Sequence, residues 1–241
     1  MNETPQTSPP RAPYYRVENA LCNREVLLAC LYLAVHIFAM PLFINWLQGK
    51  FPVLDTLRAN LLYYGVGVLF TLTALYRGMR LSFDALLDRP LLAMSGLCSA
   101  WFLDLVLTLA LLGISTYLLP QLAEGVDTDQ FYTVTDGVYR KLIYLSILLA
   151  PLVEVPLFCG GLFGPLRSKS RLLAYAVTCL VYGVYQVWQY AWSAGDTRYL
   201  LFILSYIPSC AALCRGYERT GSLWVPIFFQ MVLSATALVL L

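Results

Sequence analysis

The stretch that decides the fold is APLVEVPLFCGGLF, residues 150–163. It spans about four turns of an α-helix and holds one charged side chain, Glu154, among apolar ones. An ionisable group among apolar residues is costly in a membrane and usually marks a functional site. The stretch therefore predicts a membrane-buried helix with Glu154 at the centre of a polar site.

The composition of the whole chain predicts a membrane protein. Hydrophobic residues make up 59% of the 241 residues and charged residues 12%, and the mean hydropathy is +0.67. Soluble domains contain about 45–50% apolar and about 25% charged residues, so this chain lacks the polar residues for a water-facing surface. We expect an all-α, polytopic transmembrane helix bundle with about seven spans of about 20 residues each. The apolar runs place these spans near residues 26–47, 56–76, 91–115, 142–164, 171–190, 198–215 and 222–241.

The ends of the chain differ in character. Residues 1–18 are polar and rich in proline, which predicts a disordered N-terminal tail. Residues 19–241 are expected to form a single transmembrane domain, because apolar runs follow one another with short connections.

The basic residues predict the orientation of the chain. With seven spans, the N-terminal side of the membrane collects eleven of the sixteen basic residues: Arg11, Arg16, Arg24, Arg77, Arg80, Arg89, Arg167, Lys169, Arg171, Arg215 and Arg219. The other five are Lys50, Arg58, Arg140, Lys141 and Arg198. An excess of Lys and Arg marks the cytoplasmic side, so we expect a cytoplasmic N-terminus. The small net charge of +2 gives no reason to expect a nucleic-acid partner.

Few residues other than Glu154 are candidates for chemistry. The seven cysteines are scattered without a C-x-x-C pair, which favours buried packing over a disulfide framework or a zinc finger. His36, the one histidine, is expected to be a polar core residue. Asp104 is the second carboxyl group within a span, and it either bonds to a neighbouring helix or lines a pathway. Aromatic residues near the end of the fifth span fit an interfacial belt: Tyr182, Tyr185, Trp188, Tyr190 and Trp192.

Three patterns in the second half of the chain belong together. The first is the frame around Glu154, with Ala150-Pro151 before it and Phe158 and Gly160 after it. The second is YGVYQ at residues 182–186, and the third is QMVLS at residues 230–234, preceded by the run ERTGSLWVPI at residues 218–227. In order and spacing, residues 145–241 resemble the CAAX-protease and bacteriocin-processing (CPBP, or Abi) family of intramembrane metalloproteases. In that family the patterns read E-E-x-x-x-R, F-x-x-x-H and H-x-x-x-N, hold a divalent metal, and activate a water for attack on a peptide bond.

Most of the family's functional positions carry other residues in this chain. The positions of the two glutamates, the arginine, the two histidines and the asparagine are occupied by Glu154, Val155, Cys159, Gln186, Gln230 and Ser234. A catalytic zinc needs about three protein ligands and an open position, and an amide is a far poorer zinc ligand than an imidazole. The resemblance therefore implies no intact catalytic residue, no bound metal and no cofactor. What remains is a polar pocket formed by Glu154, Tyr182, Gln186, Gln230 and Ser234.

These substitutions predict a catalytically inactive CPBP-family protein, a pseudoprotease of the bacterial plasma membrane. We expect it to act as a binding or regulatory scaffold, with the lipid bilayer and either another membrane protein or a hydrophobic or lipidated peptide as partners. The pocket either binds a ligand or only holds helices together through hydrogen bonds. One alternative is an active intramembrane metalloprotease of the CAAX or bacteriocin-processing type, with zinc in an atypical site. Another is a small transporter whose pathway is lined by Asp104 and Glu154.

Overall fold

The computed structural model describes residues 20–51, 54–118 and 147–240. Every regular element in these ranges is a helix, which confirms the predicted all-α fold. The elements are α1 (Asn23–Ala34), η1 (Val35–Ala39), α2 (Met40–Lys50), α3 (Thr56–Ala74), α4 (Tyr76–Asp88), α5 (Pro90–Leu118), η3 (Pro156–Phe163), α8 (Gly164–Lys169), α9 (Arg171–Ala194), η4 (Thr197–Phe202), α10 (Ile203–Thr220) and α11 (Trp224–Leu240). Residues 147–155 form a helix that leads directly into η3. The expected disordered tail, residues 1–18, lies outside the described residues.

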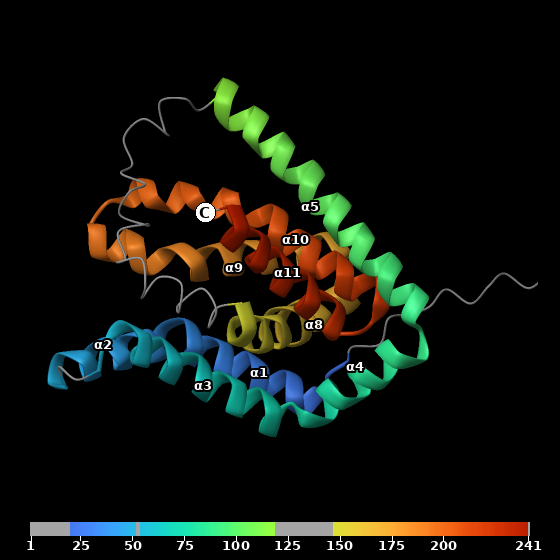
Figure 1. Ribbon diagram of the computed structural model, residues 1–241, viewed down its shortest axis with the longest axis horizontal. Helices are drawn as coiled ribbons and strands as arrows, with labels where there is room; N and C mark the ends of the chain where they lie inside the picture. Colours follow the sequence, from blue (N-terminus) through green and yellow to red (C-terminus); the bar gives the residue numbers. More distant parts are fainter. Residues whose placement is uncertain (1–19, 52–53, 119–146, 241) are drawn as a thin grey trace, which may run out of the picture.

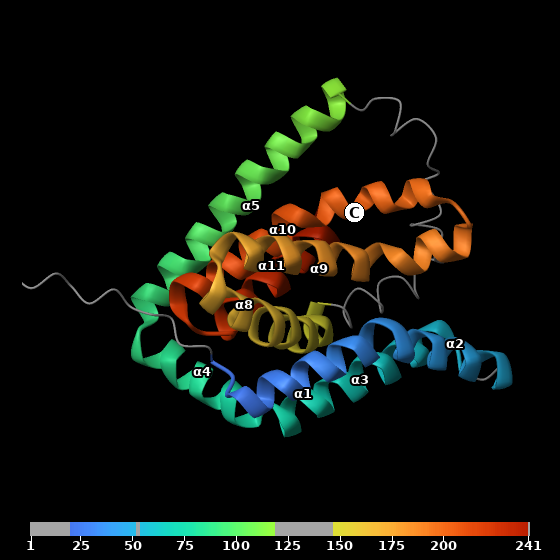
Figure 2. The ribbon, with the colours of Figure 1, turned by 180° about the vertical axis from the view of Figure 1, so that it is seen from behind.

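Two layers of helices enclose a central segment (Figure 1). Helices α1 to α4 form one layer, and α9, α10 and α11 form the other. Residues 147–169, drawn in yellow, lie between the layers, and the view from behind shows the same arrangement (Figure 2). Helix α5 packs against α10 and α11, and its far end leaves the bundle (Figure 1).

The central segment is buried more completely than any other apolar segment that could span a membrane in the described residues. In its most apolar window 67% of the residues are buried, against 6% in the corresponding window of α5. Its second half is the π-helix η3, which begins at Pro156. Proline has no N–H to donate to the carbonyl four residues earlier, and this favours a local change of helix type. Gly161 allows α1 to approach closely, because a Cβ at this position would lie 2.8 Å from the Cβ of Ala29.

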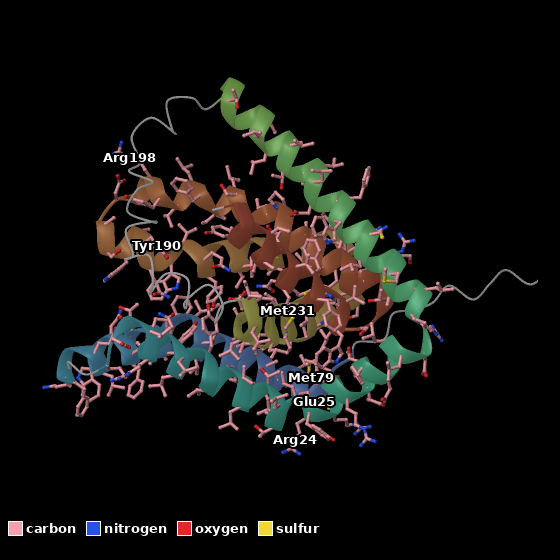
Figure 3. All side chains as sticks on the ribbon, in the orientation of Figure 1. Arg24, Glu25, Met79, Tyr190, Arg198 and Met231 are labelled. Carbon is pink, nitrogen blue, oxygen red and sulfur yellow. The ribbon has the colours of Figure 1, made fainter. Side chains whose placement is uncertain are left out.

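The corner between α3 and α4 is held by residues from both ends of the chain. The two helices meet at an angle of 79°. Glu25 accepts a backbone hydrogen bond from α4 at 2.9 Å, and the indole N–H of Trp224 donates to the carbonyl of Met79 at 3.1 Å. Glu25 and Met79 lie close together at this corner (Figure 3). Helix α10 ends at Gly221, whose φ of 70° is a left-handed conformation that glycine adopts easily. The run at residues 218–227 thus connects α10 to α11 and places the start of α11 against α4.

Within the described residues, fewer segments meet the length and hydropathy of a membrane span than the seven that the sequence predicts. By length and hydropathy, four described segments qualify: Asn23–Lys50, Pro90–Ile114, Ile147–Lys169 and Arg198–Thr220. The bent pair α3 and α4 makes a fifth if it counts as one span. The expected spans 171–190 and 222–241 coincide with helices α9 and α11. Helix α9 falls short because tyrosine, glutamine and tryptophan lower its hydropathy, and the apolar part of α11, Trp224–Thr236, is short.

Candidate functional site

The site is centred on Glu154, at the end of the helix that leads into η3. Its side chain is 3% exposed, and three neutral side chains donate hydrogen bonds to its carboxyl group. The hydroxyl of Tyr185 donates to Oε1 at 3.1 Å. Oε2 accepts from Nε2 of Gln230 at 2.7 Å and from the hydroxyl of Tyr182 at 3.4 Å. Because the two tyrosines lie on α9 and Gln230 lies on α11, this one carboxyl group links the central segment to two helices.

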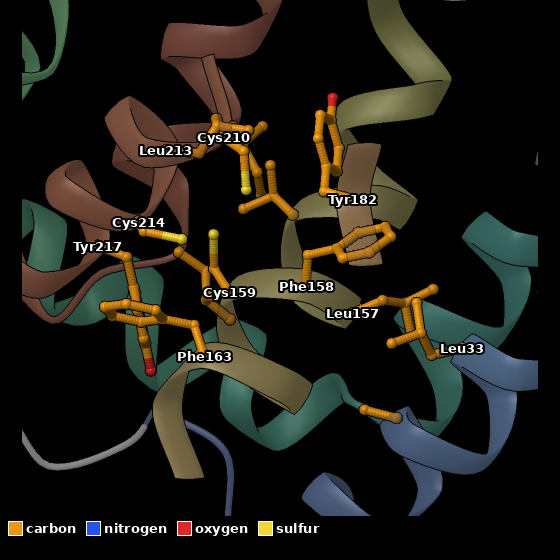
Figure 4. Close-up of a cluster of buried hydrophobic side chains, with 14 of the residues drawn as sticks. Leu33, Leu157, Phe158, Cys159, Phe163, Tyr182, Cys210, Leu213, Cys214 and Tyr217 are labelled. Atoms are coloured by element: carbon orange, nitrogen blue, oxygen red, sulfur yellow. The ribbon is translucent and has the colours of Figure 1, made fainter. Parts of the chain in front are cut away.

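The two tyrosines are core residues, and their expected place in an interfacial belt is wrong. Tyr182 and Tyr185 are both nearly inaccessible to solvent. The ring of Phe158 meets that of Tyr182 edge to face, with centroids 5.0 Å apart, and Figure 4 shows the two side by side. The two tyrosines are three residues apart and so share a face of α9. Of the expected belt, Tyr190 and Trp192 are exposed, as an interfacial position requires.

His36 joins this cluster from the opposite layer. It lies in η1, is fully buried, and its Nε2 is 3.4 Å from the hydroxyl of Tyr185. Its ring stacks on that of Tyr63 at 4.4 Å, and the Tyr63 hydroxyl donates to the His36 carbonyl at 3.0 Å. His36 is therefore a polar core residue, as the sequence predicts, but it is also one step from Glu154. The sequence offers no signal for that proximity, because His36 lies outside the part of the chain that carries the family patterns.

The other residues of the expected pocket are placed differently. Gln186 is half-buried and lies one helical turn after Tyr182 on α9, and among the described residues no hydrogen bond joins it to Glu154. Ser234 is partly exposed on α11, and within the described residues it makes no hydrogen bond to the other four. Glu154, Tyr182 and Gln230 are brought together directly, Gln186 indirectly, and Ser234 not at all.

Val155 and Cys159, which the resemblance aligns with the second glutamate and the arginine, lie in the apolar core. Val155 is 1% exposed and belongs to the main hydrophobic cluster. Cys159 belongs to the same cluster, as do the free thiols Cys210 and Cys214. Figure 4 shows these three sulfur atoms turned toward one another. Small buried thiols of this kind pack as apolar groups.

The residues around Glu154 do not fit a zinc centre. Both of its oxygens already accept hydrogen bonds, and the donors are two phenols and an amide. A zinc site is built from thiolate, imidazole and carboxylate ligands. Throughout the part of the chain that the structure describes, no group of three or more His, Cys, Asp or Glu side chains is arranged to hold a metal ion.

Asp104, the second carboxyl group within a span, has no role in the cluster. It is half-buried on α5, and its Oδ1 has no hydrogen-bond partner within the described ranges. The expected hydrogen bond from Asp104 to a neighbouring helix is therefore absent among these residues.

A second buried carboxyl group, Glu218, was not singled out as a site by the sequence. It pairs with the guanidinium groups of Arg167, Arg171 and Arg215 at 2.5, 3.0 and 3.3 Å, and it accepts from the hydroxyl of Tyr175 at 2.9 Å. These donors lie on α8, α9 and α10. Through these contacts, Glu218 links α10 to α8 and α9. The signal that could have found it is the apolar context of its helix, in which a carboxyl group requires partners.

A cavity of about 460 Å³ adjoins the Glu154 cluster. It lies between α2, α3 and α9, and it shares Tyr63, Tyr185 and Gln186 with the network described above. The cluster and the cavity therefore form one continuous polar region in the bundle.

A comparison with known families found one match in the second half of the chain. The family model described as "Type II CAAX prenyl endopeptidase Rce1-like" matches residues 139–236. No curated protein and no solved structure matches the chain. The matched range includes Glu154, Gln186, Gln230 and Ser234, and it confirms the resemblance to CAAX proteases. Over residues 139–236, this membrane protein is similar to the Rce1-like family.

Proposed function

We propose that the protein is a catalytically inactive member of this family that acts as a binding or regulatory scaffold for a membrane partner or a hydrophobic peptide. The observation that carries the proposal is the hydrogen bonding of Glu154. Both oxygens of its carboxyl group accept hydrogen bonds from neutral side chains, those of Tyr182, Tyr185 and Gln230. A carboxyl group held on both oxygens by neutral side chains stabilises helix contacts and lacks the ligands that activate a water.

The surroundings of Glu154 support the same conclusion. Val155 and Cys159 stand where the resemblance places a glutamate and an arginine, and both are packed in the apolar core. A charged side chain at either position would lack water and a counter-charge. The apolar packing of Val155 and Cys159 supports an inactive site.

Helix α5 is the surface that best fits a membrane partner. Its far end extends from the bundle (Figure 1), and large apolar side chains are exposed along it, among them Phe102, Leu105 and Leu109. A contiguous exposed apolar face of a membrane protein contacts either lipid or another apolar helix.

The first experiment measures the zinc content of the purified full-length protein by elemental mass spectrometry, together with cleavage of CAAX-type peptides. We expect far less than one zinc per chain after incubation with the metal, and no cleavage. About one zinc per chain, lost in Glu154→Ala and accompanied by chelator-sensitive cleavage, would instead establish an active protease. The match to an endopeptidase family is the observation that favours this second function.

A designed site tests the assignment of positions. The triple variant Val155→Glu/Gln186→His/Gln230→His restores the ligand types that the resemblance requires and should bind zinc. Its matched control is Val155→Glu/Gln189→His/Gln230→His, in which one imidazole is moved a helical turn along α9. Equal zinc binding by both folded variants would show that Gln186 does not stand at a ligand position.

A further inference from the structure

The cavity beside the Glu154 cluster has the size of a ligand site. Its volume of about 460 Å³ lies within the range of roughly 300–1,000 Å³ that small-molecule sites occupy. Tyr63 and Tyr185 form its buried base, and Asn45 and Gln189 belong to its exposed rim. Tyr190, labelled in Figure 3, lies at the same end of α9.

The lining of this cavity is polar but uncharged. Eleven of the fourteen described lining residues carry a hydroxyl or an amide group, and none of the fourteen is charged at neutral pH. Four are tyrosines, and five are amides: Asn45, Gln48, Asn60, Gln186 and Gln189. Most ligand pockets are instead predominantly apolar, with a few polar groups.

This lining argues against three classes of ligand. A charged ligand would leave water without meeting a counter-charge among the described residues, which is costly. A hydrophobic peptide or a lipid tail would bury amides and hydroxyls without partners, because three of the fourteen lining residues, Pro41, Ile44 and Ala59, are aliphatic. The cavity thus suits a ligand that is neutral and polar over most of its surface.

Several of the amides have hydrogen-bonding groups to spare. Asn45 and Gln189 make no hydrogen bonds within the described part of the chain. Asn60 donates to the Thr56 carbonyl at 2.9 Å, and Gln48 donates to the Leu54 carbonyl at 3.4 Å, so each has a side-chain oxygen left over. An amide offers a donor and an acceptor side by side, and a hydroxyl group both donates and accepts. The flat faces of tyrosine rings supply apolar area for the C–H face of a sugar ring.

From these observations we propose that the cavity binds a neutral, polyhydroxylated ligand of the mono- or disaccharide class. The hydroxyl of Tyr185, at the base, is held by Glu154 and lies near His36, so a bound ligand is linked to the polar cluster. This proposal goes beyond the scaffold function and does not depend on whether the protein is catalytically inactive.

The test is calorimetric titration of the full-length protein in phosphatidylcholine nanodiscs, which contain no sugar head groups. The probes are D-glucose, N-acetyl-D-glucosamine and maltose, compared with the charged sugars D-glucuronate and D-glucosamine. We expect at least one neutral sugar to bind, and the charged sugars to bind at least about tenfold more weakly because their charge is not compensated.

Variants at the rim locate the binding. Asn45→Leu and Gln189→Leu each remove one or two ligand hydrogen bonds, and each should weaken binding about five- to thirtyfold. The matched control is Asn23→Leu, an exposed amide at the start of α1 that does not line the cavity, and it should leave the affinity unchanged. All three variants should keep the melting temperature of the natural protein. The proposal is overturned if no neutral sugar binds at millimolar concentration, if charged sugars or hydrophobic peptides bind equally well, or if the rim variants match the control.

Discussion

Glu154 and Glu218 are both buried carboxyl groups that hold three helical segments together, but their partners differ in charge. Glu218 meets three guanidinium groups and a tyrosine hydroxyl. Glu154 meets two tyrosine hydroxyls and an amide, and no cation. Glu218 is thus compensated by charge, whereas Glu154 is satisfied by hydrogen bonds alone.

This difference indicates which of the two carboxyl groups needs its negative charge to hold its helices together. The arginines around Glu218 lie close enough to repel one another, so the carboxylate is needed to keep α8, α9 and α10 together. The groups around Glu154 are neutral and would tolerate a neutral replacement that kept their hydrogen bonds. The two sites therefore predict different responses to the same substitutions.

The largest expected effect is that of Glu218→Ala. It leaves the arginines without a counter-charge, and removing one partner of a buried ion pair costs about 3–5 kcal/mol. The arginine side chains are 36–57% exposed, so solvent screening reduces our expectation to about 3 kcal/mol. Reversible unfolding in detergent measures the loss. Arg171→Gln, which removes the most exposed of the three cations, should cost far less, and an equal loss would show that charge balance is not the cause.

Glu154→Ala should have the next largest effect. It leaves the hydroxyls of Tyr182 and Tyr185 and the amide of Gln230 without their acceptor. Buried donors without a partner cost about 1–3 kcal/mol each, but the neighbouring cavity admits water that can replace the carboxyl oxygens. We expect a destabilisation of about 2 kcal/mol in the same unfolding experiment. A loss as large as that of Glu218→Ala would mean that the cavity does not hydrate the cluster.

The isosteric change Glu154→Gln sharpens the comparison. Glutamine keeps one acceptor oxygen for Gln230 or Tyr185, so the variant should lose about 1 kcal/mol. Glu218→Gln keeps the same shape but removes the negative charge that pairs with the three arginines, and it should lose clearly more stability. If both glutamine variants lose the same free energy of unfolding, the difference in charge between the partners of Glu154 and those of Glu218 does not affect stability.

The smallest effect is expected at an exposed ion pair. Asp196 and Arg198 are joined at 2.9 Å, and the pKa of Asp196 is lowered by the backbone N–H of Arg198 and then by its guanidinium group. Such a lowered pKa adds stability at neutral pH that is lost as the pH falls through the folded-state value. Because the pair is exposed, Asp196→Asn should leave the melting temperature unchanged at neutral pH. A resolved shift in the melting temperature would contradict this.

Composition was sufficient for the fold class, because so few charged residues leave no alternative to a helix bundle in a membrane. The apolar runs predict the helical segments, but among the described residues α9 falls short of the hydropathy of a span, since it carries tyrosines such as Tyr182 and Tyr185 that face the interior of the bundle. Glu154, Tyr182 and Gln230 were grouped by resemblance alone. The place of Tyr185 in the cluster is predictable from the sequence, because Tyr185 follows Tyr182 by three residues and shares its helix face. The contact of His36 with Tyr185 is not predictable, because it depends on how η1 packs against a helix far away in the sequence.

The π-helix η3 sets the angle between the two carboxyl sites. Glu154 precedes η3, and Arg167, which pairs with Glu218, follows it on α8. Each residue advances an α-helix by about 100°, so deleting one residue within η3 would rotate Arg167 by about that amount relative to Glu154. The winding of these eight residues therefore fixes the direction of Arg167 relative to Glu154. With the π-helix between them, Glu154 can bind Tyr182, Tyr185 and Gln230 while Arg167 pairs with Glu218.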